Sequence, residues 1–74
     1  MPHVAIKHFP ASLSDAGRRA LVDAVTSAVT SAFGCDEGVV SIALEPVDPE
    51  DWNERVYVPE ILGRQSLLCK APDY

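Results

Sequence analysis

The stretch SDAGRRALVDAVTSAVTSAFG, residues 14–34, decides the fold of this chain. Ser14 and Asp15 are typical of a helix start, because a serine side chain caps free N–H groups and an acid there suits the helix dipole. Gly34 stands where a left-handed C-cap glycine belongs. Between them, apolar residues recur at helical spacing and predict one continuous stripe. They are Ala16, Ala20, Leu21, Ala24, Val25, Ala28, Val29, Ala32 and Phe33. We interpret this alanine-rich stripe as the face that packs on a sheet.

A strand is predicted on each side of this helix. Residues 3–9 alternate around β-branched and aromatic side chains. Residues 39–44 form a second apolar run, with Val40, Ile42 and Leu44 on one face. The order strand, long helix, strand predicts one βαβ unit whose two strands are parallel and joined by a right-handed crossover.

The rest of the chain is less regular. Asp48-Pro49-Glu50-Asp51 predicts a short helical turn that carries Trp52. Residues 54–58 fit extended or irregular structure, and a last short helix is expected over about 60–69. The predicted fold class is therefore α+β. It is a single domain over residues 1–74 with a two-stranded parallel sheet and a short C-terminal helix.

The first turns of the helix carry two adjacent cations, Arg18 and Arg19. The helix dipole does not favour positive charge at this end. Pairing with Asp15 and Asp23 at helical spacing, or with another subunit, would compensate.

A chain of 74 residues with a formal net charge of −5 needs support beyond its own core. A core this small rarely supplies more than about 3–5 kcal/mol. Its two cysteines, Cys35 and Cys69, cannot build a disulfide framework, and we expect free thiols in a reducing, cytoplasmic setting. His3 and His8 fall on opposite faces of a strand, so they cannot share a metal ion.

Neither nucleic acid nor a membrane is an expected partner. The basic residues are scattered rather than clustered, and no apolar stretch is long enough to span a bilayer. Oligomerisation remains as the expected source of additional stability, because a lone βαβ unit leaves one sheet face and both sheet edges open. Two copies related by a two-fold axis would form a four-stranded sheet with both helices on one side. The C-terminal segment or another dimer would cover the free face.

The Met1-Pro2 start offers a route to catalysis without a catalytic side chain. Initiator methionine is normally removed before a small residue such as proline, and its removal exposes a secondary amine. An α-amino group titrates near about 8, and a low-dielectric pocket or a nearby cation lowers that value. An amine near the operating pH takes and returns protons efficiently. By itself, however, Pro2 also fits an ordinary strand start.

The whole layout resembles the tautomerase superfamily, typified by 4-oxalocrotonate tautomerase. The similar stretch runs from Pro2 to Trp52 and includes the Ser14-Asp15 helix start. The opening PHVAIKHFP, the run Ser41-Ile42-Ala43-Leu44 and the closing Lys70-Ala71-Pro72-Asp73-Tyr74 are similar to the short dimeric branch with phenylenolpyruvate-type activity.

The resemblance implies a cofactor-independent keto–enol tautomerase. Pro2 would take the hydroxyl proton of a 2-hydroxydienoate or enolpyruvate and return a proton to carbon, which yields the 2-oxo acid. Trp52 would be the aromatic wall of the pocket and would help to lower the pKa of the proline amine. No metal or organic cofactor is implied, and a homodimer is favoured over a hexamer.

The sequence departs from the type enzyme at its two substrate-binding arginines, which match Leu13 and Ser41 here. Each lost charge-assisted contact is worth about 1.5–3 kcal/mol. These positions therefore indicate a monoacid with an apolar or aromatic tail. The cation that meets the remaining carboxylate stays open, with three basic side chains as candidates. They are Lys7, Arg55 and Arg64.

Two other classes of function stay open. A hydratase/dehalogenase or a decarboxylase would keep Pro2 on the same scaffold, although the absent arginines weigh against both. A non-catalytic oligomeric module would use Pro2 only as a strand start. Retention of Met1 would block the amine and favour that module.

Overall fold

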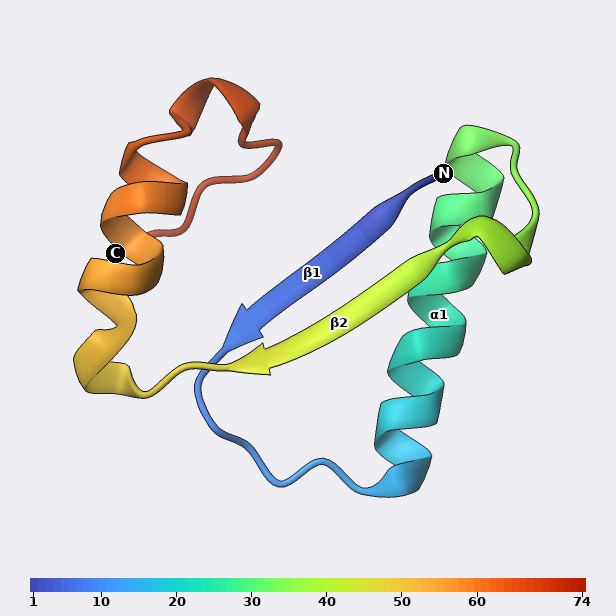
Figure 1. Ribbon diagram of the computed structural model, residues 1–74, viewed down its shortest axis with the longest axis horizontal. Coiled ribbons are helices and arrows are strands. Elements are labelled where there is room, and N and C mark those ends of the chain that lie inside the picture. The colour runs from blue at the N-terminus through green and yellow to red at the C-terminus, as the bar shows by residue number, and fades with distance from the viewer.

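The computed structural model describes all residues, Met1–Tyr74, and contains the predicted βαβ unit. Strand β1, His3–His8, pairs in parallel with strand β2, Ser41–Pro46, and His3 lies opposite Ser41 in the register. Helix α1, Asp15–Phe33, connects the two strands (Figure 1). The α+β class with a two-stranded parallel sheet is therefore confirmed.

Both predicted ends of α1 are confirmed by their hydrogen bonds. The Ser14 hydroxyl oxygen accepts a hydrogen bond from the Gly17 N–H at 3.0 Å. Gly34 adopts φ 64°, and its N–H donates to the Thr30 carbonyl at 2.9 Å. A residue with a Cβ is strained in this left-handed conformation, which explains the glycine.

The packing face of α1 is narrower than predicted. Leu21, Val25 and Val29 are half-buried, as the stripe requires. The alanine line from Ala16 to Ala32 is exposed, and Phe33 is 72% exposed. Within the single chain, the prediction that the whole stripe packs on a sheet was therefore wrong. Two strands are too narrow to cover a stripe of that width, so part of it faces outward.

The second strand begins slightly later than predicted. Residues Glu37–Val39 form a 3₁₀-helix, and β2 starts after Val40. The predicted face is confirmed, since Val40, Ile42 and Leu44 are half-buried. The next turn is also confirmed, because Pro49–Asp51 is a 3₁₀-helix directly before Trp52.

The C-terminal helix lies earlier in the chain than predicted. Asn53–Leu62 is a π-helix and Gln65–Leu67 a 3₁₀-helix, so both the irregular segment over 54–58 and the bounds 60–69 were wrong. Pro59 lies inside the π-helix. Val56 is buried in this helix, at 6% exposed, and the local sequence pattern alone did not reveal its burial.

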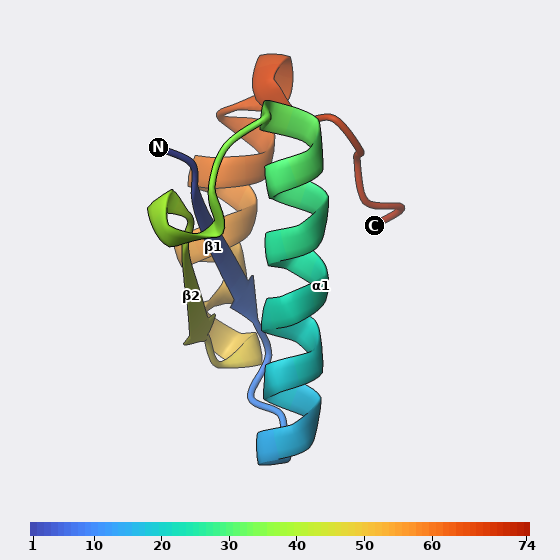
Figure 2. The ribbon, with the colours of Figure 1, turned by 90° about the vertical axis from the view of Figure 1, so that its right-hand side faces the viewer.

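The strand pair separates α1 from the C-terminal segment, as the two ribbon views show (Figures 1 and 2). Only Val47, 1% exposed, and Val56 are buried, so the core sits where β2 leads into that segment. Ion pairs Lys7–Glu60 and Arg55–Glu45 join the π-helix to the strands. Lys7 and Glu45 are themselves opposite each other in the register. No helix is both long and apolar enough to cross a membrane.

Candidate active site

Pro2 lies at the amino end of the strand pair, immediately before β1. Its carbonyl accepts a hydrogen bond from the Ser41 N–H at 3.2 Å, which fixes it beside the start of β2. Pro2 is half-buried, whereas Met1 is 98% exposed. Removal of Met1 would therefore uncover the proline nitrogen without disturbing packed side chains.

A cavity of about 440 Å³ surrounds this end of the chain, and we call it the amino-end cavity. Strand β1, helix α1 and the segment after it all contribute to its wall. Its lining residues are Met1, Pro2, His3, Val4, Val29, Phe33 and Cys35. The wall is mostly apolar and contains no carboxylate. Such surroundings disfavour a charged amine and suit an acid/base group that must give up its proton.

His3 and Ser41 form a polar pair next to Pro2. Nδ1 of His3 lies 2.6 Å from Oγ of Ser41, within hydrogen-bonding distance. The two residues are opposite each other in the parallel register, so the backbone itself brings their side chains together. The sequence placed a substrate-binding position at Ser41 but did not identify His3 as its partner.

The carboxyl end of the strands carries a second, aromatic pocket of about 590 Å³, lined by Lys7, His8, Phe9, Trp52 and Tyr74. The rings of Phe9 and Trp52 meet edge to face, with centroids 5.1 Å apart. The Trp52 indole N–H donates to the Tyr74 hydroxyl at 3.0 Å. Tyr74 thus holds the Trp52 indole by a hydrogen bond. The sequence did not predict this contact because the two residues are remote in the chain.

Leu13 lies in a third cavity, of about 320 Å³, beside the start of α1. Its lining residues are His8, Pro10, Ala11, Leu13, Arg18, Leu44 and Pro46. Arg18 is a cation in this wall that was not among the sequence candidates. Two of those candidates, Lys7 and Arg55, are already engaged in ion pairs with carboxylates.

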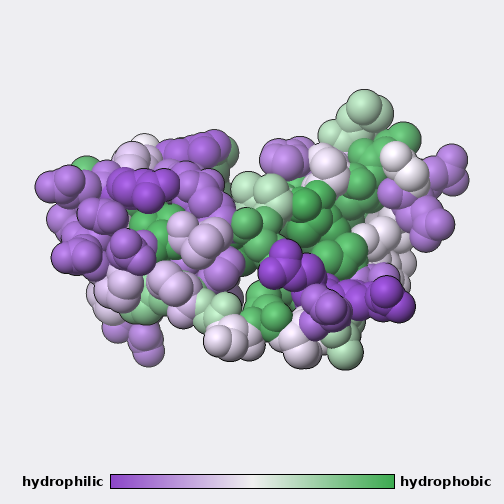
Figure 3. Space-filling model, turned by 60° about the horizontal axis from the view of Figure 1, so that its bottom comes forward, coloured by the Kyte–Doolittle hydropathy of each residue, from purple (hydrophilic) through white to green (hydrophobic).

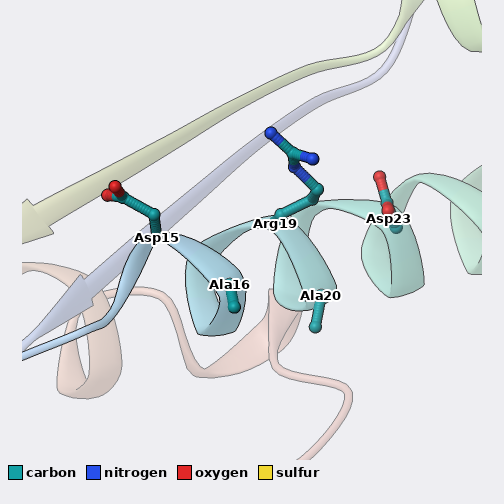
Figure 4. A pocket seen from close by; sticks show the side chains of 5 residues that line it. All are labelled: Asp15, Ala16, Arg19, Ala20 and Asp23. Atoms are coloured by element: carbon teal, nitrogen blue, oxygen red, sulfur yellow. The ribbon is translucent and has the colours of Figure 1, made fainter.

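The outer face of α1 carries a further pocket of about 430 Å³, which holds none of the predicted site residues (Figure 4). Asp15, Arg19 and Asp23 point to one side of the helix, and Ala16 and Ala20 point to the other. All five are exposed, and neither Arg18 nor Arg19 forms the expected ion pair within the chain. This pocket is therefore a solvated helix surface rather than a formed site.

The four predicted site residues divide between the two ends of the sheet. Pro2 and Ser41 lie together at the amino end, while Leu13 and Trp52 lie in separate pockets at the carboxyl end. A six-residue strand spans about 20 Å, so one small substrate cannot touch both ends of one chain. No three side chains of metal-ligating type gather anywhere in the chain.

The sequence matches one family of known proteins. The family model described as "Tautomerase enzyme" matches residues 2–55. The chain is 39% identical over 74 residues to the Tautomerase PptA of Cronobacter sakazakii, and the match covers 100% of this chain and 97% of that relative. The proteins of the same name from Enterobacter sp. and Pectobacterium carotovorum are 38% and 31% identical over the same shares of each chain.

Proposed function

The chain belongs to the tautomerase family, and from this premise we propose that it is a cofactor-independent keto–enol tautomerase with Pro2 as general acid/base. The substrate is a small 2-hydroxy-enoate of the enolpyruvate type. The free proline nitrogen takes the enol hydroxyl proton while the C2–oxygen double bond forms. The electron pair of the former C=C bond then takes a proton from the proline ammonium at C3. The product is the 2-oxo acid, and the amine is regenerated.

The amino-end cavity is the observation that carries this proposal. Pro2 lines it together with apolar side chains such as Val29 and Phe33, and none of the chain's acidic residues does. An apolar wall disfavours the ammonium form, so the amine is more readily available as a base. The lack of acids also suits an anionic substrate, which a nearby carboxylate would repel.

The exposed surface supports a homodimer. The chain exposes 5679 Å², whereas a compact monomer of this size exposes about 4,500 Å². Its radius of gyration is 13.9 Å, against about 11 Å for a compact domain of this length. Hydrophobic side chains gather in the middle of one face, with hydrophilic ones around them (Figure 3). A second copy is the occupant that this surface and the two open sheet edges fit.

A two-fold axis also supplies the reason for a divided site. Two strand pairs joined edge to edge by such an axis run antiparallel, forming a four-stranded sheet. The amino end of one chain then lies near the carboxyl end of its partner. In this arrangement the aromatic pocket around Trp52 forms one wall of the amino-end cavity around Pro2 of the other chain. A dimer is sufficient to bring the amino end of one chain next to the carboxyl end of its partner, so we favour a dimer over a hexamer.

The expected substrate carries one carboxylate and an apolar or aromatic tail. Leu13 and Ser41 offer no charge to a second carboxylate, and the pocket at Phe9 and Trp52 offers ring faces to a hydrophobic tail. Both cysteines, Cys35 and Cys69, are free, which suits a reducing cytoplasmic setting.

The decisive test compares wild type with Pro2→Ala on phenylenolpyruvate, followed by ultraviolet absorbance. Alanine also permits removal of Met1, so this variant keeps a free amine and changes only its chemistry. We expect kcat/KM to fall about 100-fold or more, the usual contribution of general acid/base catalysis. Pro59→Ala is the matched control, because Pro59 is exposed and lies in the π-helix. Equal rates for Pro2→Ala and wild type would end the proposal.

The state of the amine is tested separately by mass spectrometry. The purified protein should lack one methionine residue, and a 3-halopyruvate should alkylate the new N-terminus at Pro2. Retention of Met1 on active protein would contradict the mechanism and favour a different base.

A further inference from the structure

Apart from Cys35, His3 is the only residue lining the amino-end cavity whose side chain carries a hydrogen-bond donor. The chain has eleven acidic residues, yet none lines this cavity, and no lysine or arginine does either. A substrate carboxylate bound next to Pro2 would therefore meet one ionisable side-chain donor from this chain. That donor is the His3 imidazole.

The His3 ring is held by a neighbour in the sheet. Its Nδ1 is paired with the Ser41 hydroxyl at 2.6 Å, and the Ser41 N–H is bound to the Pro2 carbonyl at 3.2 Å. Ser41 thus connects Pro2 and His3 through its backbone and its side chain at once. Because Nδ1 is occupied, Nε2 is the nitrogen of His3 that can bind a ligand.

The His3 ring offers Nε2 as a donor in two forms. In the neutral tautomer in which the serine hydroxyl donates to Nδ1, the ring proton resides on Nε2. When the imidazole is cationic, both ring nitrogens donate and the ring adds a positive charge. Either form can donate a hydrogen bond to a carboxylate, and the cationic form does so more strongly.

We propose that His3 binds the substrate carboxylate through Nε2 and that Ser41 is the positioning residue that holds its ring. The inference rests on the proposed function. It names a group in this chain that takes over from the arginines absent at Leu13 and Ser41. Ser41 then does more than replace an arginine without binding the substrate, because its hydroxyl orients the His3 imidazole that binds the carboxylate instead.

The kinetic consequence is specific. The carboxylate keeps its charge as the enol becomes the ketone, so a contact to it binds ground state and transition state alike. Loss of such uniform binding raises KM and leaves kcat nearly unchanged. Loss of Pro2 would instead lower kcat.

The test measures kcat and KM of His3→Ala, Ser41→Ala and Ser41→Thr on phenylenolpyruvate. We expect His3→Ala to raise KM about tenfold, the equivalent of about 1.4 kcal/mol, with kcat within about threefold of wild type. Ser41→Ala should raise KM less, and Ser41→Thr, which keeps the hydroxyl, should restore it. Ser66→Ala is the matched control, since Ser66 is exposed and lines none of these cavities.

A binding readout keeps the inference independent of turnover. Phenylpyruvate titrated into nitrogen-15-labelled protein should shift the Nε2 resonance of His3, assigned with the His3→Ala variant. A wild-type KM in His3→Ala, or phenylpyruvate binding that leaves the His3 resonance unmoved, would overturn the inference. Neither result would touch the proposed function, which is tested by the activity of Pro2→Ala and by the state of the N-terminus.

Discussion

The two ends of the strand pair differ in how far the chain completes them. At the carboxyl end, Val47 and Val56 are buried and Trp52 contacts both Phe9 and Tyr74. At the amino end, Phe33 is 72% exposed beside an open cavity. The two buried side chains of the molecule thus pack at the end where the C-terminal segment joins the sheet. The end that bears the proposed catalytic amine stays open, and a partner would complete it in the proposed dimer.

The largest expected effect comes from placing a charged side chain in the core at the carboxyl end of the strand pair. Val47→Asp should abolish folding, because an unpaired carboxylate at a site 1% exposed costs more than about 3 kcal/mol. The whole core supplies little more than that. Thermal denaturation followed by circular dichroism checks this. Val58→Asp, at a site 48% exposed, is the control and should melt within a few degrees of wild type.

The next prediction concerns the joining of the two ends across a dimer. Pro2→Ala and Trp52→Ala should each be impaired, yet co-refolding an equal mixture should raise activity. Statistical mixing leaves about a quarter of the sites with both native residues if the site is shared between chains. If each chain instead held a complete site, mixing would give no gain over the average of the two variants.

A smaller effect is expected at the C-terminal residue. Tyr74→Phe removes the hydroxyl that accepts the Trp52 N–H and should cost about 0.5–1.5 kcal/mol in stability. Trp52 is the only tryptophan, so its fluorescence emission reports the change directly. Tyr57→Phe is the matched control. The Tyr57 and Tyr74 ring centroids are 5.6 Å apart, but the Tyr57 hydroxyl does not accept the Trp52 N–H. An unchanged emission spectrum in Tyr74→Phe would contradict the bond.

The smallest effects are expected at the two ion pairs of the carboxyl end. Double-mutant cycles should give about 0.2–1 kcal/mol for each pair, and salt should weaken both. Lys7–Glu60 should couple more strongly than Arg55–Glu45. Its side chains are 30% and 35% exposed, against 52% and 48% in the other pair. The reverse order would show that burial does not govern these contacts.

Local chemistry was readable from the sequence wherever neighbouring residues decide the outcome. Ser14 and Gly34 bound α1 because a cap depends on a few adjacent N–H and C=O groups. The π-helix was misread because it is joined to β1 by the Lys7–Glu60 ion pair, whose residues are distant in sequence. At the site, Pro2 and Ser41 were named from a family pattern, but their closeness follows from the parallel register.

The sequence by itself determined the order strand, helix, strand and the proline that follows Met1. Periodicity and capping are properties of short segments, so they survive without knowledge of the fold. Only the tertiary structure decided that the alanine line faces outward and that His3 pairs with Ser41. It alone placed Trp52 at the opposite end of the sheet from Pro2. These relations join residues far apart in the chain, and the width and register of two strands set them.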